Sequence, residues 1–285
     1  MSEEIPFERT KHLLTIAVTL SGSVRTRFVL DTGMGVNLIS NSLRDRVGLV
    51  ATSEVLQERL WSGQRLETPI EVIPSLGIGQ KEWTDLKVIS IDTSGFDPAL
   101  GNVGGFLSIG PFSCLAFTID HDRHILRLHE DGDHGFRDAL GYEEVDLHLR
   151  QERTSLTPEV DLALPDGNNA RVILDTGSDS LLLNVRYMAP LGVNPSDEGV
   201  RTVESRDDWG FSYRRHFASV DGAFRILGTS RIREIIAPVA FQQIESEGLL
   251  GSSFLSRYNV TCDLPRSRVG FAPCPRLPHA RLAVK

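Results

Sequence analysis

Two aspartates occupy the same unusual setting in this sequence of 285 residues. Asp31 follows the apolar run 28–30, and Asp175 follows the apolar run 172–174. A threonine and a glycine come directly after each aspartate. Apolar runs of this length predict buried strands, and an ionised carboxylate loses free energy when it leaves water. The shared setting therefore predicts that the two carboxylates form one chemical site.

Two carboxylates that face each other have a specific chemistry. Like charges a few ångströms apart do not ionise together easily, so the pair shares one proton and titrates as a unit. One carboxylate can then take a proton from water while the other donates a proton to a carbonyl. This chemistry suits direct attack of water on an amide, without a covalent intermediate.

The residues after each aspartate suit that geometry. Gly33 and Gly177 leave room for the two backbones to approach, and their N–H groups can point at the carboxylates. Thr32 and Thr176 carry hydroxyls that can bond across the pair and hold both loops rigidly.

The elements that position these residues are repeated along the chain. Residues 15–33 and 159–177 both alternate apolar with polar residues, then turn, and then run into the aspartate. This pattern predicts a β-hairpin that ends at each Asp-Thr-Gly. Residues 105–128 align without gaps to 248–271, and a weaker likeness relates 76–89 to 224–239.

The repeat predicts an all-β fold with two related lobes and pseudo-twofold internal duplication. The lobes are expected at 1–135 and 136–285, each with one aspartate, joined through the Gly- and charge-rich stretch 129–141. Helical patterning is scarce. A short helix is expected at 41–50, with a counterpart at 181–193.

Composition narrows the class of protein. The net charge of −8 argues against nucleic acid or an anionic membrane as partner. No segment approaches the ~18 apolar residues of a membrane span. The N-terminal residues 1–10 carry no secretory signal pattern, which predicts a cytoplasmic protein. The three cysteines predict free buried thiols.

No metal site is expected. The spacing of four histidines favours solvated loop side chains over metal ligands; they are His121, His124, His129 and His134.

The sequence resembles the aspartic proteases, both pepsin-like and retropepsin-like, as a single-chain, two-lobed member with two DTG motifs. The resemblance rests on 29–33 and 173–177, and on the paired segments 106–112 and 249–255. It implies an aspartic endopeptidase with Asp31 and Asp175 as the catalytic pair, supported by Thr32, Gly33, Thr176, Gly177 and Ser178.

The resemblance also carries implications for cofactors and partners. It implies no metal or organic cofactor, and a peptide or protein substrate in a cleft between the lobes. A monomer suffices, because both aspartates lie in one chain. A selective processing role inside the cell is a hypothesis.

The family closes β-hairpin flaps over its substrate. The turn Trp61-Ser62-Gly63 is about thirty residues beyond Asp31, and Trp209-Gly210 stands similarly beyond Asp175. These two turns are therefore expected to contact the substrate, since aromatic rings can pack on it and exclude water.

Four residues depart from the family pattern and keep an alternative open. Small residues usually follow DTG, as Ser178 does, but Met34 stands after the first motif. Asn37, Leu181 and Ser108 also differ from the usual residues. The alternative is a catalytically weak module that binds peptides or proteins and keeps the protease fold.

Overall fold

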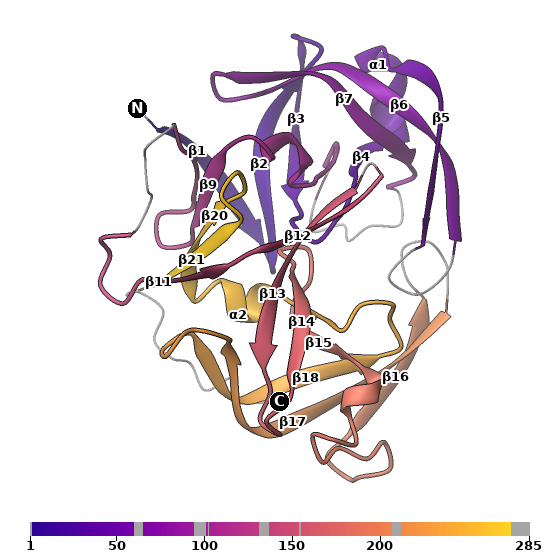
Figure 1. The fold of residues 1–285 in the computed structure, drawn as a ribbon. Coiled ribbons are helices and arrows are strands. Elements are labelled where there is room, and N and C mark those ends of the chain that lie inside the picture. Colours follow the sequence, from indigo (N-terminus) through magenta and orange to yellow (C-terminus); the bar gives the residue numbers. More distant parts are fainter. Residues whose placement is uncertain are drawn as a thin grey trace.

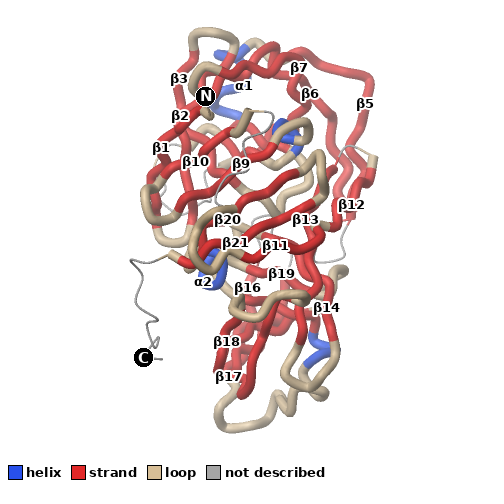
Figure 2. Tube along the Cα trace, turned by 60° about the vertical axis from the view of Figure 1, so that its left-hand side comes forward, coloured by secondary structure: helices blue, strands red, loops and turns tan. Residues whose placement is uncertain are grey.

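The computed structural model describes residues 2–59, 65–93, 101, 103–130, 137–153, 155–206 and 212–274. Within these ranges the protein is built mainly from β-strands, with a few short helical turns, as expected (Figures 1 and 2). The strands form a 13-stranded sheet and an 8-stranded sheet.

The first Asp-Thr-Gly lies at the end of a hairpin in the larger sheet. Strands β2 (Leu13–Leu20) and β3 (Val24–Leu30) are antiparallel, as the alternation of apolar residues predicts. Ser21 and Gly22 make the turn with φ values of 46° and 70°. Beyond β3 the sheet continues with β8 (Gly105–Leu107), β4 (Asn37–Ser40), β7 (Lys81–Ile91), β6 (Arg65–Ile78) and β5 (Val50–Arg59).

The second Asp-Thr-Gly ends a hairpin in the 8-stranded sheet. Strands β13 (Ser155–Ala163) and β14 (Asn169–Leu174) are antiparallel, and Gly167 supplies the positive φ that their turn requires. In order across the sheet the strands are β12 (His148–Glu152), β13, β14, β19 (Gly248–Leu250), β15 (Leu181–Asn184), β18 (Arg233–Gln242), β17 (Ser212–Ile226) and β16 (Arg201–Arg206).

The pairings around the two hairpins follow one scheme. Strand β3 runs parallel to β8, and β14 runs parallel to β19. Strand β4 is antiparallel to β8 and parallel to β7, just as β15 is antiparallel to β19 and parallel to β18. Each Asp-Thr-Gly therefore leaves its strand at a point where a parallel partner strand also ends.

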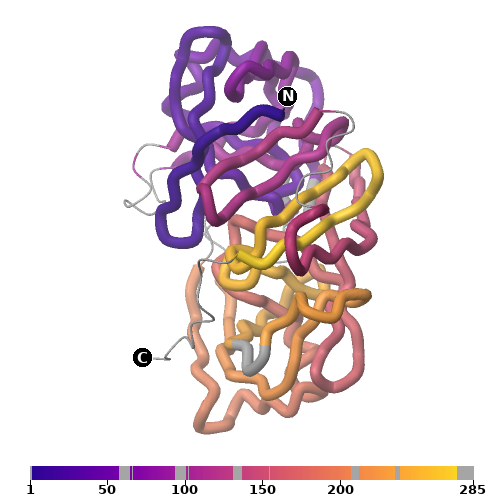
Figure 3. The backbone as a smooth tube through the Cα atoms, turned by 90° about the vertical axis from the view of Figure 1, so that its left-hand side faces the viewer, coloured from indigo at the N-terminus to yellow at the C-terminus, as the bar shows by residue number. Residues whose placement is uncertain are grey.

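Six strands, from the N-terminal, central and C-terminal parts of the chain, lie side by side between these hairpins. Their order is β11 (Glu143–Asp146), β21 (Arg268–Pro273), β20 (Tyr258–Asp263), β9 (Ala116–Asp120), β10 (Ile125–Leu128) and β1 (Glu3–Thr10). Strands β9 and β20 pair with Thr118 opposite Thr261, and the two hydroxyl oxygens are 2.7 Å apart. In Figure 3 the yellow β20–β21 hairpin lies between the indigo-to-magenta body and the orange body. The domain bounds 1–135 and 136–285 stay a prediction.

The expected helices are half right. Helix α1 (Asn41–Val47) lies inside 41–50, and Ser40 caps it by accepting from the Ser42 N–H. In 181–193 the chain instead forms β15 and one 3-10 turn, η3 (Val185–Tyr187). The leucines of 181–183 are buried and pair with β18 and β19, so this segment forms a strand of the sheet. Pro190 and Gly192 disfavour a helix in the residues that follow. Two other short turns are η2 (Gly110–Phe112) and α2 (Ser252–Leu255).

One large apolar cluster spans residues of both hairpins, and a smaller one lies beside the first Asp-Thr-Gly, with Met34 packed against it. Among the described residues, no helix is both long and apolar enough to cross a membrane. The cytoplasmic location stays a prediction.

Candidate active site

The two aspartates are held in place by the parallel strands beside them. The backbone N–H of Asp31 donates to the Leu107 carbonyl at 2.9 Å, and that of Asp175 donates to the Leu250 carbonyl at 3.1 Å. Both side chains are buried, with 8 % and 9 % of their surface exposed. The sheets thus fix two carboxyl groups in a place with little exposure to solvent.

The glycines of the two motifs allow the carboxyl groups to approach each other's backbone. A Cβ atom on Gly33 would lie 2.3 Å from Cγ of Asp175. A Cβ atom on Gly177 would lie 2.2 Å from Oδ2 of Asp31. Each aspartate therefore occupies the space that any side chain on the opposite glycine would need.

The threonines join the two loops by reciprocal hydrogen bonds. The Thr32 hydroxyl donates to the Leu174 carbonyl at 2.6 Å and accepts from the Thr176 N–H at 3.1 Å. The Thr176 hydroxyl donates to the Leu30 carbonyl at 2.7 Å and accepts from the Thr32 N–H at 3.1 Å. Both hydroxyls are buried, so these bonds are shielded from competing water.

Backbone N–H groups hold one oxygen of each carboxyl group. Oδ1 of Asp31 accepts from Gly33 and Met34, both at 3.1 Å. Oδ1 of Asp175 accepts from Gly177 at 2.9 Å and from Ser178 at 3.2 Å. The other oxygen of each group is left for the opposite aspartate or for a substrate.

The two carboxyl groups are electrostatically coupled. Burial and the nearby charge of Asp175 hold the pKa of Asp31 well above its usual range. Burial also raises the pKa of Asp175, while the Gly177 N–H and a hydrogen bond from Asp31 act against that rise. Burial thus raises the pKa of both carboxyl groups, and the pair shares one proton and titrates as a unit.

The departures from the family pattern have structural counterparts. Met34 keeps the backbone bond to Asp31, and its side chain packs on the small apolar cluster. Asn37 accepts from both the N–H and the hydroxyl of Ser108 through Oδ1. In the second half a Cβ on Gly251 would lie 2.6 Å from the Ser180 carbonyl, so this position has no room for a serine. Asn37 and Ser108 thus form a bonded pair, whereas Gly251 is required by the close backbone of Ser180.

An apolar pocket of about 230 Å³ adjoins the first loop. Its wall includes Gly35 and Val36 from the loop and side chains of β5, β6 and β7, namely Leu56, Ile70, Leu86 and Val88. The polar groups of Asn37 and Ser108 at this pocket bond to each other, and the Asn37 amide donates to the Lys87 carbonyl at 3.1 Å.

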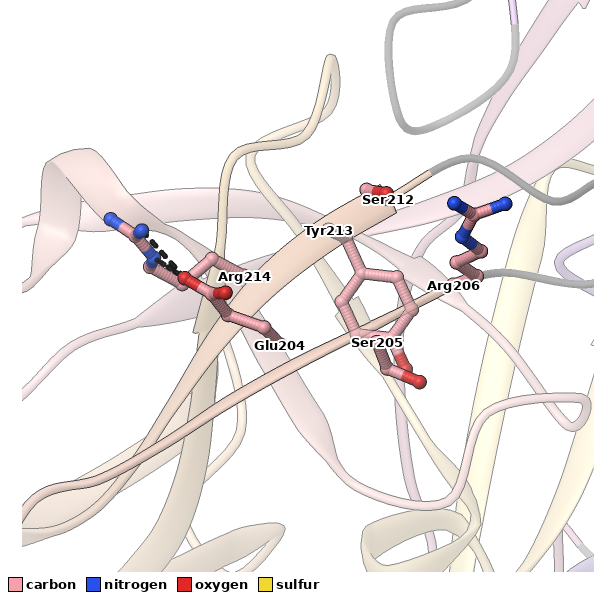
Figure 4. Close-up of a pocket in the computed structure, with 6 residues that line it drawn as sticks. All are labelled: Glu204, Ser205, Arg206, Ser212, Tyr213 and Arg214. Atoms are coloured by element: carbon pink, nitrogen blue, oxygen red, sulfur yellow. Dashed lines mark hydrogen bonds and ion pairs between the residues drawn. The ribbon is translucent and has the colours of Figure 1, made fainter.

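The proposed flap residues Trp61, Ser62, Gly63, Trp209 and Gly210 all lie outside the described residues. The hairpins that lead to them are described, as β5–β6 and β16–β17. An open hollow on the second hairpin is lined by residues 204–206 and 212–214 (Figure 4). Glu204 and Arg214 form an ion pair there at 2.6 Å. None of its lining residues belongs to an Asp-Thr-Gly loop.

The expectation of solvated histidines was wrong for two of the four. His121 and His129 are buried, at 6 % and 3 % exposed, while His124 is exposed and His134 lies outside the described residues. His121 packs against the Phe7 ring and accepts from Arg9, and His129 bonds to the Thr118 hydroxyl at 2.6 Å. No group of three or more potential metal ligands is found in the part of the chain that the structure describes.

The free thiols are divided between core and surface. Cys262 and Cys274 are buried, but Cys114 is exposed.

Sequence reasoning missed two residues that touch the second loop. His12 lies 3.1 Å from the Gly177 carbonyl, and the Ser252 hydroxyl lies 3.2 Å from the Thr176 carbonyl. Ser252 follows Gly251 in a repeated segment and could have been found there. His12 is 165 residues away from its partner in the chain, and nothing in the local sequence marks it.

Comparison with known proteins bears on the first half of the site. Residues 16–103 match a family model described as aspartyl protease. This span contains the first Asp-Thr-Gly and the strands around it, from β2 to β7. No curated protein matches the chain. The matched segment, together with the geometry around Asp31, supports an aspartyl protease family and hence a hydrolase for this chain.

Proposed function

We propose that this protein is an aspartic endopeptidase in which Asp31 and Asp175 form the catalytic pair. One observation carries the proposal: each aspartate packs against the glycine of the other motif, while each threonine bonds into the other loop. Buried carboxyl groups are costly unless they are paired, so this arrangement has no structural purpose that an apolar core would not serve better.

We assign one role in the reaction to each aspartate of the pair. The ionised Asp175 takes a proton from a water molecule, and that water attacks the carbonyl carbon of the scissile amide. The protonated Asp31 donates to the carbonyl oxygen as the tetrahedral intermediate forms. Asp175 then gives its proton to the leaving nitrogen while Asp31 takes back the proton from the former carbonyl oxygen, so that the C–N bond breaks and the pair returns to its starting state. The protein itself forms no covalent bond with the substrate.

The recurring strand pairings support a two-lobed molecule that arose by internal duplication. The substrate would be a peptide or protein segment lying between the two halves. The pocket beside the first loop suits an apolar side chain of that segment, because its polar wall groups already bond to each other. A selective processing role remains a hypothesis.

Cleavage of a diverse peptide mixture, followed by mass spectrometry from pH 3 to 8, tests the proposal. Asp31→Asn and Asp175→Asn are each expected to lower the rate at least ~100-fold, because each removes one member of the proton-transfer pair. Asp166→Asn is a matched control: Asp166 is exposed in the β13–β14 turn, and among the described residues its side chain accepts hydrogen bonds from nearby Asn168.

The same experiment separates an enzyme from a binding module. Equal rates in the parent chain and in both dyad variants would refute the catalytic pair. Peptides that bind without being cut, at every pH, would favour the module.

A further inference from the structure

We propose that His12 is a positioning residue for the dyad: it fixes, from outside the second loop, the peptide group that holds Asp175. This inference rests on the proposed function for its kinetic test, but its structural basis is independent of it. His12 lies in the two-residue turn between β1 and β2, on the opposite half of the chain from Asp175.

The contact is made to a peptide group that also binds the carboxylate. His12 Nε2 lies 3.1 Å from the Gly177 carbonyl oxygen. A carbonyl oxygen only accepts, so Nε2 must carry the proton and donate. The same peptide group continues into the N–H of Ser178, which donates to Oδ1 of Asp175 at 3.2 Å.

One peptide plane therefore connects the imidazole to the carboxylate. In a trans peptide the C=O and the N–H point in opposite directions, so fixing the oxygen also fixes the direction of the N–H. A donor on the oxygen polarises the group and strengthens the bond that its N–H donates. His12 thus acts on Asp175 without touching it.

The turn that carries His12 is itself fixed against the loop. The Ser252 hydroxyl lies 3.2 Å from the carbonyls of both His12 and Thr176, and it can donate to either. The Ser252 N–H donates to the Ser178 carbonyl at 2.8 Å. The backbone of the His12 turn is thus fixed beside the second loop.

The corresponding turn of the second half differs in sequence. The β12–β13 turn is the counterpart of the β1–β2 turn, and its residues are Arg153 and Thr154, with Thr154 where the first turn has His12. Arg153 and Lys11 both adopt a positive φ, at 48° and 54°, so these two turn positions share one backbone conformation. A threonine supplies no imidazole, and Thr154 lies outside the described residues.

Charge acts in the same direction as the hydrogen bond. Burial raises the pKa of Asp175, and the charge of His12 is among the influences that lower it. The other charged groups of these segments are Asp31 across the pair, Asp179 after the loop and Lys11 beside His12. Loss of His12 is thus expected to raise the pKa of Asp175 and make it a poorer base near its pKa.

Two substitutions at this position test the idea. His12→Phe keeps a ring but removes the donor and the charge, and is expected to lower kcat about 3- to 10-fold with little change in KM. The acidic limb of the kcat/KM profile of His12→Phe should move to higher pH, because Asp175, the base, then ionises at a higher pH. His12→Gln keeps an N–H at a similar reach and should restore most of kcat. His148→Phe is the control, since its partners Asp161 and Arg171 belong to neither loop.

A readout that needs no activity separates this inference from the proposed enzyme. With ¹³C-labelled aspartate, NMR titration of the Asp175 carboxyl, assigned with Asp175→Asn, should show a higher apparent pKa in His12→Phe than in the parent. That shift would support the role of His12 even if no peptide is cut. Superimposable titrations in the parent and His12→Phe would overturn it, as would a loss of kcat in His12→Gln equal to that in His12→Phe.

Discussion

At the scale of single residues, the site depends on what Gly33 and Gly177 lack. Neither glycine is required by a positive φ, since both are absent from the residues with φ in that region. Their role is spatial, because the opposite carboxyl group fills the volume of a side chain. The Asp-Thr-Gly motif therefore works as one unit. The glycine of each motif leaves room for the aspartate of the other motif.

Replacing one of these glycines should displace the opposite aspartate. In Gly33→Ala the new Cβ would overlap Cγ of Asp175 at 2.3 Å, and a buried carboxyl group cannot move freely. We expect peptide cleavage to fall at least ~100-fold, as for other misplacements of about 1 Å in a catalytic group.

A second glycine provides the control for this prediction. A Cβ on Gly199 would meet nothing within 4 Å, so Gly199→Ala should leave the cleavage rate and the free energy of unfolding nearly unchanged. Full activity in Gly33→Ala would show that the carboxyl groups are not packed as the structure has them.

At the scale of elements, two hairpin ends from different sheets are joined through the threonines. The strands β3 and β14 each end against the other's loop, so neither loop has its final geometry alone. The hydroxyl of Thr32 satisfies two backbone groups of the other loop, the Leu174 carbonyl and the Thr176 N–H. A change at Thr32 should thus affect the stability of the whole molecule.

The substitution Thr32→Val tests this junction with little change of shape. It leaves two buried backbone groups without a partner, which is expected to lower the free energy of unfolding by about 2–4 kcal/mol. Thr32→Ser keeps the hydroxyl and should recover most of that loss. Urea unfolding measures both variants, and a stability of Thr32→Val equal to that of Thr32→Ser would contradict the role of the hydroxyl.

The elements also show which features the sequence could predict. The hairpins before both aspartates were predictable, because alternation of apolar residues and turn residues such as Gly167 act locally. The counterpart of α1 was not, because pairing of β15 with β18 and β19 overrides the local pattern. His12 was also missed, since its partner Gly177 is reached only through the tertiary fold.

At the scale of the whole molecule, a buried histidine connects stability to pH. His121 lies where β1, the end of β9 and β20 meet. Its ring bonds to Arg9, and its backbone N–H donates to Oδ1 of Asn259. Its Nδ1 lies 3.0 Å from the Arg9 guanidinium, which only donates, so the imidazole is neutral. Burial, with the charge of Arg9, lowers the pKa of His121 to about 3.

This shift has a definite sign for stability. Between pH 6.5 and about 3 the unfolded chain binds a proton at His121 and the folded chain does not, so acid favours unfolding. The full window corresponds to at most ~5 kcal/mol, and most of the stability is present only above the ordinary histidine pKa. Strongly acidic conditions are therefore expected to lower the free energy of unfolding of this protein.

The substitution His121→Gln should reduce this dependence on pH. A glutamine stays neutral and can still accept from Arg9, so the fall in the free energy of unfolding from pH 7 to pH 4.5 should be ~2–3 kcal/mol smaller than in the parent. Urea unfolding at both pH values measures the difference, with His148→Gln, a histidine whose side chain is 37 % exposed, as the control. An unchanged slope in His121→Gln would mean that other groups govern acid unfolding.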